Sequence, residues 1–152
     1  MDTLELRRTT PQDLPRILEI ERLSYPAPWN VHTFLSVFSD EDCMNLTCVW
    51  RGAIVGFCLT EVMTKMVHLL NLAVHPEFRR QGLGRSMLGE IISFARSNRK
   101  SYVFLEVRRT NNTAQALYTS LGFSAVCTWR RYYTDSGEDA CIMAKRIEVM
   151  TP

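Results

Sequence analysis

The chain has 152 residues, of which 46% are hydrophobic and 22% charged, and its formal net charge at pH 7 is +2. Such values are typical of one globular domain, and the small charge gives no electrostatic reason to expect nucleic-acid binding. Five cysteines without a Cys-x-x-Cys pair favour reduced thiols over a disulfide framework or a zinc site. No apolar segment has the length of a transmembrane helix. We therefore expect a single cytoplasmic domain over residues 1–152, with no membrane partner.

The first predicted elements are an edge strand and two helices. Residues 3–8 alternate weakly, as an edge strand would, and residues 10–23 begin with an N-cap, a proline and an early acid that predict a helix. Prolines end that helix, and Asn30 is the expected N-cap of a second helix that ends near Phe38. Trp29 lies in the connection, where it suits either a wall for a peptide substrate or a cap on the core.

Six further strands are predicted, and two of them are joined by a helix. Short turns after the first and second of these strands predict antiparallel neighbours, whereas the long link from Val74 to Tyr102 predicts a parallel pair with a right-handed crossover. The last two strands form a hairpin. The six strands cover residues 46–50, 53–60, 67–74, 102–107, 124–134 and 140–147.

A glycine-rich turn follows the strand at residues 67–74. It reads Arg79-Arg80-Gln81-Gly82-Leu83-Gly84-Arg85 and leads into an amphipathic helix. Glycines let the backbone approach a ligand, and the first N–H groups of a helix lack partners within it, so the turn suits an anion. A dinucleotide fingerprint would need glycine at Met87, and a Walker loop would need Gly-Lys before Ser or Thr. The turn alone also fits a plain connection with a solvated basic cluster.

The strand at residues 102–107 is apolar except for Glu106. Burying an unpaired carboxylate costs roughly several kcal/mol, so this glutamate is paired, lies at a wet strand end, or is retained for chemistry. In the next helix Asn111 is the expected N-cap and Gly122 the expected C′ residue. Tyr118 belongs to the apolar stripe of that helix, so its spacing alone indicates a core residue.

Together these motifs resemble a known family. The pattern Arg-x-x-Gly-x-Gly after a strand is similar to the pyrophosphate-binding motif of the GCN5-related N-acetyltransferases (GNAT). The order and spacing from Asn111 to Gly122-Phe123 resemble the signature that closes the cofactor site in that family. Residues 71–74, 80–85, 105–108 and 132–133 resemble its RimI-like branch, and the likeness covers essentially the whole chain.

The resemblance implies a mixed α/β GNAT fold. Its central twisted sheet would be mostly antiparallel, with one parallel pair splayed around acetyl-coenzyme A and about four flanking helices. The pantetheine arm would pair with the edge formed by Leu72, Ala73 and Val74. Asn111 would contact the coenzyme through its side chain. The pyrophosphate would bind the N–H groups of Arg80, Gln81, Gly82, Leu83, Gly84 and Arg85.

The resemblance also assigns catalytic and acceptor-binding roles. Glu106 would be the general base, acting through water, with apolar neighbours that raise its proton affinity. Tyr118 would be the general acid that protonates the sulfur of coenzyme A, because tyrosine is normally protonated at pH 7. The residues that would border the acceptor peptide are Pro28, Trp29, Tyr132 and Tyr133.

In the RimI-like branch the acceptor is the N-terminal alanine of small-subunit ribosomal protein eighteen. The resemblance thus implies a ribosomal protein as substrate, with no direct nucleic-acid contact, and we expect a monomer. Two alternatives stay open: an acetyltransferase for a lysine side chain or a small amine, and a non-catalytic coenzyme A-binding or ribosome-associated module. We expect no metal, since His32, His68 and His75 lie in different elements without a carboxylate cluster.

Overall fold

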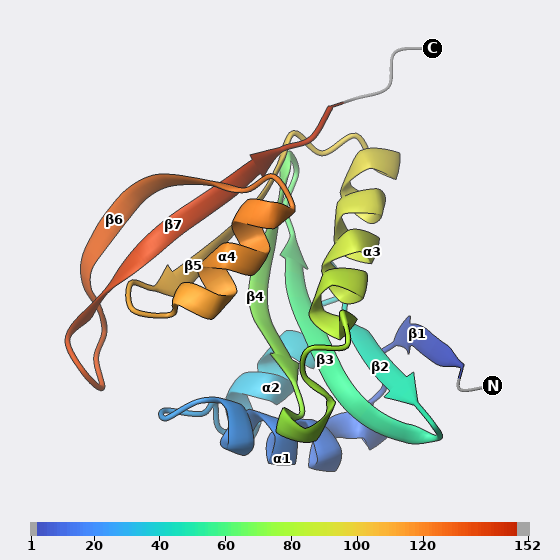
Figure 1. Ribbon diagram of the computed structural model, residues 1–152. Coiled ribbons are helices and arrows are strands. Elements are labelled where there is room, and N and C mark those ends of the chain that lie inside the picture. Colours follow the sequence, from blue (N-terminus) through green and yellow to red (C-terminus); the bar gives the residue numbers. More distant parts are fainter. Residues whose placement is uncertain (1–2, 149–152) are drawn as a thin grey trace. The chain divides into compact units, whose positions relative to one another are not determined.

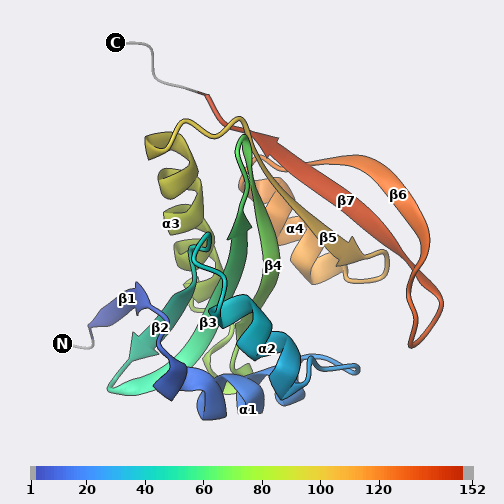
Figure 2. The ribbon, with the colours of Figure 1, turned by 180° about the vertical axis from the view of Figure 1, so that it is seen from behind.

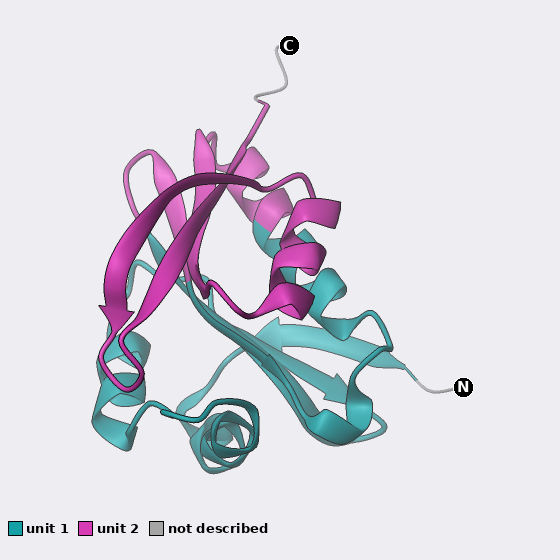
Figure 3. Ribbon diagram, turned by 60° about the vertical axis from the view of Figure 1, so that its left-hand side comes forward, with its two compact units in different colours: residues 1–62, 70–91 teal, residues 63–69, 92–152 magenta. Residues whose placement is uncertain are grey.

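The computed structural model describes residues 3–148 (Figure 1). The chain divides into two compact units (Figure 3). Unit 1 comprises residues 1–62 and 70–91, and unit 2 comprises residues 63–69 and 92–152. One strand, β4 (Met66–Val74), and one helix, α3 (Leu83–Ser97), run from one unit into the other. The single domain expected over residues 1–152 stays a prediction, and its terminal residues 1–2 and 149–152 lie outside the described part.

Seven strands form one sheet in the order β1-β2-β3-β4-β5-β7-β6. The pairs β1–β2, β2–β3, β5–β7 and β6–β7 are antiparallel, and β4–β5 is parallel. The mostly antiparallel sheet with one parallel pair is therefore confirmed. The other strands are β1 (Leu4–Arg8), β2 (Leu46–Trp50), β3 (Ala53–Val62), β5 (Tyr102–Arg108), β6 (Ser124–Tyr133) and β7 (Glu138–Arg146).

The two N-terminal helices begin where their capping residues predict. A 3-10 turn, η1 (Pro11–Asp13), leads into α1 (Leu14–Ser24), and the Asp13 carboxylate accepts the Thr10 N–H at 2.9 Å. Helix α2 (Val31–Phe38) follows Asn30, whose side chain accepts the Thr33 N–H at 3.0 Å. The Asn30 cap satisfies a backbone donor that the helix leaves without an internal partner, whereas the Asp13 carboxylate binds the N–H of the residue that precedes the 3-10 turn.

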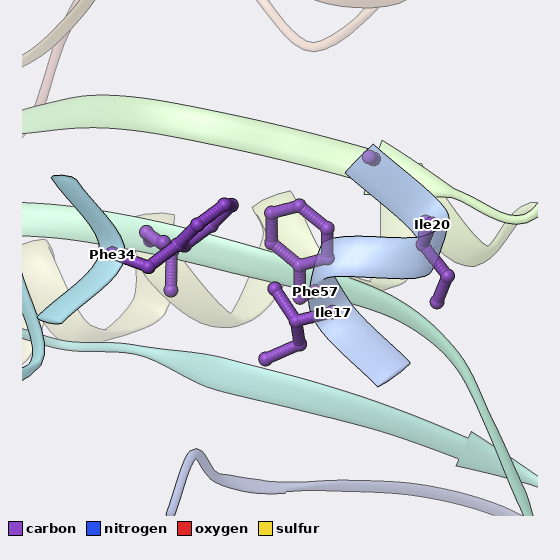
Figure 4. Packing of buried hydrophobic residues seen from close by; sticks show 6 residues of the cluster. Ile17, Ile20, Phe34 and Phe57 are labelled. Carbon is purple, nitrogen blue, oxygen red and sulfur yellow. The ribbon is translucent and has the colours of Figure 1, made fainter. Parts of the chain in front are cut away.

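The core of unit 1 lies where α1 and α2 pack on β3. Both helices cover one face of the strands of this unit, and the first turns of α3 cover the other (Figures 1 and 2). The Phe34 and Phe57 rings lie 5.9 Å apart in an edge-to-face arrangement, and each such buried side chain contributes about 1.5–3 kcal/mol through its burial. The cluster comprises Ile17, Ile20, Phe34, Phe57, Leu59 and Ala73 (Figure 4).

Helix α4 (Asn112–Ser120) covers one face of the strands of unit 2 (Figures 1 and 2). The Asn111 side chain accepts the Ala114 N–H at 3.1 Å, so the predicted N-cap is confirmed. At the other end Gly122 has φ +93°, a left-handed conformation that ends the helix and that glycine adopts without strain. The final hairpin of β6 and β7 is also confirmed. Of the helices within residues 3–148, none is both long and apolar enough to cross a membrane.

Candidate active site

Glu106 is paired, and its partner is a histidine from the neighbouring parallel strand. The His68 Nε2 atom lies 2.6 Å from the Glu106 Oε2 atom, and the two side chains are 19% and 11% exposed. The His68 ring also stacks on Phe104, with 4.3 Å between centroids and 9° between planes. The sequence predicted apolar neighbours for this carboxylate. Its closest polar neighbour is instead an imidazole, which gives it a fixed orientation.

The second predicted catalytic residue, Tyr118, is buried in unit 2. It lies on α4 and is 8% exposed, with its ring 5.9 Å from that of Phe123. The Phe123 N–H donates to the Tyr118 carbonyl at the end of the helix. The ring is therefore packed against Phe123 in unit 2, as the apolar stripe predicted.

Two predicted acceptor residues of unit 2 lie within electrostatic range of Glu106. Burial, followed by the Glu106 charge, raises the pKa of Tyr132. Burial chiefly raises the pKa of Tyr133 to about 12, with Arg108 acting in the opposite direction and Glu106 adding to the increase. The two tyrosine rings are perpendicular, with centroids 5.0 Å apart. The charge of Glu106 therefore contributes to the raised pKa of both tyrosines.

Arg108 holds this part of the hairpin in place, and the sequence analysis did not anticipate its role. Its guanidinium lies 4.0 Å from the centre of the Tyr133 ring and donates to both oxygens of Asp135, at 3.1 and 3.0 Å. The guanidinium also lowers the pKa of Asp135. A planar cation that contacts a ring face and a carboxylate together orients both groups.

In unit 1 the glycine-rich turn has the backbone that an anion site needs. Arg80 has φ +65° and Gly82 has φ +76°, both left-handed, and Gln81 lies between them. A Cβ built at Gly82 would meet no atom within 4 Å, so backbone conformation and not space favours glycine there. The three remaining predicted residues, Leu83, Gly84 and Arg85, form the first turn of α3, where N–H groups lack helical partners.

The predicted pantetheine edge lies at the end of β4. The parallel ladder with β5 joins residues 66–69 to residues 102–105, and β4 continues to Val74. The His75 N–H donates to the Val55 carbonyl of β3, so by strand alternation Leu72 and Val74 turn their backbone groups away from β3. The Tyr25 hydroxyl donates to the Leu72 carbonyl, and Arg79 Nε donates to the Val74 carbonyl at 2.9 Å. Ala73, between them, is 5% exposed.

A buried carboxylate fixes the loop that carries Pro28 and Trp29. Glu21, 1% exposed, accepts the Trp29 N–H and the Asn71 side-chain amide, each at 2.9 Å. Desolvation raises the pKa of this carboxyl, and the two hydrogen bonds oppose that shift. The Trp29 ring lies 5.2 Å from the buried Phe34 ring. Trp29 thus caps the core, and the same contacts hold its loop in one conformation.

Comparison with known proteins identifies the group to which these features belong. Residues 14–123 match the family described as Acetyltransferase (GNAT) family. The chain belongs to the GNAT family.

Individual GNAT proteins match over nearly the full length. The [Ribosomal protein bS18]-alanine N-acetyltransferase of Escherichia coli (strain K12) is 38% identical over 151 residues, which is 98% of this chain and 100% of the relative. A protein of the same description from Haemophilus ducreyi is 34% identical over 88% of this chain and 93% of the relative. The crystal structure of the ribosomal-protein-S18-alanine N-acetyltransferase from Escherichia coli superposes with a TM-score of 0.89. It is 37% identical and covers 100% of this chain and 97% of its own.

Within this GNAT chain the predicted site residues are divided between the two units. Unit 1 contains the turn, the β4 edge and the Trp29 loop, and unit 2 contains Glu106, Tyr118 and the tyrosines of β6. Asn111 is also in unit 2, where its Oδ1 atom caps α4. No group of three or more His, Cys, Asp or Glu residues within residues 3–148 is arranged to hold a metal ion.

Proposed function

We propose that this chain transfers the acetyl group of acetyl-coenzyme A to the N-terminal α-amino group of a protein. The acceptor is the N-terminal alanine of ribosomal protein bS18, and the reaction takes place in the cytoplasm. One observation carries this proposal: 38% identity, over 98% of this chain, to a protein described as the bS18-alanine N-acetyltransferase. The oriented Glu106 carboxylate supports it, because it offers a base for the acceptor amine.

The coenzyme would be held mainly by backbone groups. The N–H groups of residues 80–85, in the turn and the first turn of α3, would bind the pyrophosphate, where the helix dipole favours negative charge. The pantetheine arm would pair with the outward backbone groups of Leu72 and Val74. The Leu72 and Val74 carbonyls already accept Tyr25 and Arg79, so their N–H groups are the first donors for this pairing. The amide nitrogen of Asn111 would contact the coenzyme, since its oxygen caps α4.

The chemistry requires removal of one proton and delivery of another. An α-amino group has a pKa of about 8 and is mostly protonated at pH 7. Glu106 would take this proton, through water, and the neutral amine nitrogen would then form a bond to the thioester carbon. The carbon–sulfur bond then breaks, Tyr118 protonates the departing thiolate, and the proton that the nitrogen loses as the amide forms replaces the one that Tyr118 gives up. Tyr132 and Tyr133, which Arg108 orients, would flank the acceptor backbone, with Pro28 and Trp29 as further acceptor contacts.

The acceptor can be tested by mass spectrometry of products formed from three peptides and acetyl-coenzyme A. One peptide begins with alanine, the second begins with serine, and the third is N-terminally blocked and contains an internal lysine. We expect acetylation of the alanine-first peptide at its α-amine, and then of intact bS18. Acetylation of the lysine peptide alone would overturn the acceptor assignment, while acetyl transfer from acetyl-coenzyme A would remain supported. No product from any peptide, with coenzyme binding intact, would favour a binding module.

A further inference from the structure

The Glu106 carboxylate has a partner to which the proposed mechanism gives no role. His68 lies on β4, in the segment that belongs to unit 2, and its side chain is 19% exposed. Its Nε2 atom is 2.6 Å from Glu106 Oε2, among the shortest hydrogen bonds of the described residues. A histidine this close to a proposed base affects the orientation of the two carboxylate oxygens.

The backbone explains why the two side chains meet. In the parallel ladder His68 pairs with Phe104, so both side chains point to the same face of the sheet. Glu106 lies two residues beyond Phe104 on β5 and therefore on that face as well. The imidazole lies flat on the Phe104 ring, 4.3 Å between centroids, and this stacking directs its edge along β5 toward the carboxylate.

The hydrogen bond determines which oxygen can act. In the proposed mechanism Glu106 is ionised before it takes a proton, and an ionised carboxylate only accepts hydrogen bonds, so His68 Nε2 would donate to Oε2. Oε2 is therefore engaged, and the plane of the carboxylate is set by a ring that is itself fixed by stacking. Because the carboxylate no longer rotates freely, its other oxygen, Oε1, points in one direction.

We propose that His68 is a positioning residue that orients Glu106 so that Oε1 receives the proton of the acceptor amine. This inference rests on the proposed function. In the step, a proton moves from the amine nitrogen through water to Oε1, the neutral nitrogen bonds to the thioester carbon, and the carbon–sulfur bond breaks as Tyr118 protonates the departing thiolate. The His68 proton stays on Nε2 throughout, so His68 holds the base and does not exchange with substrate.

The test compares variants that keep or remove the hydrogen bond. His68→Leu removes it, and His68→Gln keeps an N–H donor of similar reach. His32→Leu, on the exposed surface of α2, is the matched control for loss of an imidazole. Each substitution at position 68 is also combined with Glu106→Gln. Steady-state kinetics with the alanine-first peptide give kcat and KM, and thermal unfolding and acetyl-coenzyme A titration report fold and coenzyme binding.

We expect His68→Leu to lower kcat roughly 10- to 100-fold, because small misplacements of a reacting group have effects of this size. The KM values should be nearly unchanged, His68→Gln should recover most of the turnover, and His32→Leu should behave as the wild type. In the Glu106→Gln background, His68→Leu should cause no further loss, since its effect passes through Glu106.

Other results would overturn the inference in distinguishable ways. If Glu106→Gln is slow and His68→Leu turns over normally, the inference fails while the proposed function stands. If His68→Leu lowers kcat equally in the wild type and in Glu106→Gln, its effect does not pass through Glu106, and this result also overturns the inference. If the wild-type protein acetylates none of the peptides, the proposed function and the inference fail together.

Discussion

Two glutamates, one in each unit, have opposite surroundings. Glu21 in unit 1 is 1% exposed and accepts hydrogen bonds from the Trp29 backbone and the Asn71 amide, both neutral donors. Glu106 in unit 2 is 11% exposed in its side chain and is bonded to His68, which can carry a charge. The first carboxylate uses both oxygens to connect a loop to β4. The second uses one oxygen and lies beside the tyrosines of β6.

The difference gives a physical ground for predicting that Glu21 has a structural role and Glu106 a chemical one. A group whose two oxygens are both bonded to neutral donors is committed to a conformation, and its burial raises its pKa. A group with one bonded oxygen near the surface can still exchange a proton with substrate. Each prediction below tests whether this distinction holds.

The largest expected effect follows Glu106→Gln. We expect kcat to fall roughly 100-fold or more, because general base catalysis typically contributes 10²–10⁴-fold. The amide keeps the size of the side chain, so acetyl-coenzyme A binding and thermal stability should change little. Glu61→Gln, at an exposed site on β3, is the control. Normal turnover of Glu106→Gln would show that Glu106, like Glu21, has no chemical role, and it would contradict the distinction between them.

Tyr118→Phe should have the next largest effect. The substitution removes only the hydroxyl and keeps the ring contact with Phe123, so the helix should remain packed. Loss of a general acid should lower kcat roughly tenfold to 100-fold, toward the lower end of the usual range. Tyr102→Phe, at an exposed tyrosine on β5, is the matched control. Equal kcat values for the two variants would assign Tyr118 to the core alone.

Glu21→Gln should change stability and not chemistry. Glutamine has one acceptor oxygen for two donors, and leaving a buried donor without a partner costs about 1–3 kcal/mol. Denaturant unfolding should show this loss, while kcat of the folded protein stays near the wild-type value. Glu19→Gln on the exposed side of α1 is the control. A large fall in kcat at unchanged stability would give Glu21 a chemical role.

A third carboxyl, Asp13, sharpens the comparison through pH. Its hydrogen bonds with Arg7, at 2.8 Å, chiefly lower its pKa to about 2 from 3.8. A lowered pKa stabilises the fold above the unfolded pKa, by about 2 kcal/mol here, and this stabilisation is lost as pH falls from about 4 to 2. The pKa of Glu21 is raised, so its contribution has the opposite sign and decreases as pH rises through its folded value.

The measurement is denaturant unfolding of the wild type and Asp13→Asn across this pH range. The difference in unfolding free energy between the two proteins should be largest near neutral pH and should shrink on acidification. The matched control, Asp40→Asn, removes an exposed carboxyl and reports the effect of losing a surface charge. A constant difference for Asp13→Asn would contradict the pKa assigned to its carboxyl.

The smallest expected effect follows Gly82→Ala. A Cβ there meets no protein atom within 4 Å, so the cost in the free protein comes from φ +76° alone, about 1 kcal/mol. Calorimetric titration should show weaker acetyl-coenzyme A binding, and Gly82→Val should weaken it further. Gly52→Ala, which also has positive φ and an open Cβ site, controls for backbone strain. Equal coenzyme binding by the Gly52 and Gly82 variants would show that the glycine-rich turn does not bind the coenzyme.

Local signals allowed most of the fold to be predicted. The caps at Asn30 and Asn111, the left-handed Gly122 and the turn at Arg51-Gly52 each depend on residues a few positions apart. Such features depend on the local sequence alone, so the ends of the helices and strands could be predicted closely. The glycine-rich turn was found in the same way.

The contacts that organise the candidate site are distant in sequence and were missed. His68 and Glu106 are 38 positions apart, and Glu21 and Asn71 are 50 apart. The first pair required the register of the two parallel strands, because aligning the starts of the predicted strands, residues 67 and 102, places His68 opposite Val103 and not opposite its observed partner Phe104. The Glu21 contact depends instead on how α1 packs against β4. Arg108 and its hairpin partners likewise required the register of the sheet.

The side chains of Tyr25 and Arg79 have a consequence for solubility. An exposed strand edge with unpaired carbonyls is a template on which another chain can add a strand and begin aggregation. At the end of β4 the Leu72 and Val74 carbonyls are occupied by a hydroxyl and a guanidinium of the same unit. Two side chains of the same unit thereby make this end of β4 a poorer template for strand addition by a second copy of the chain.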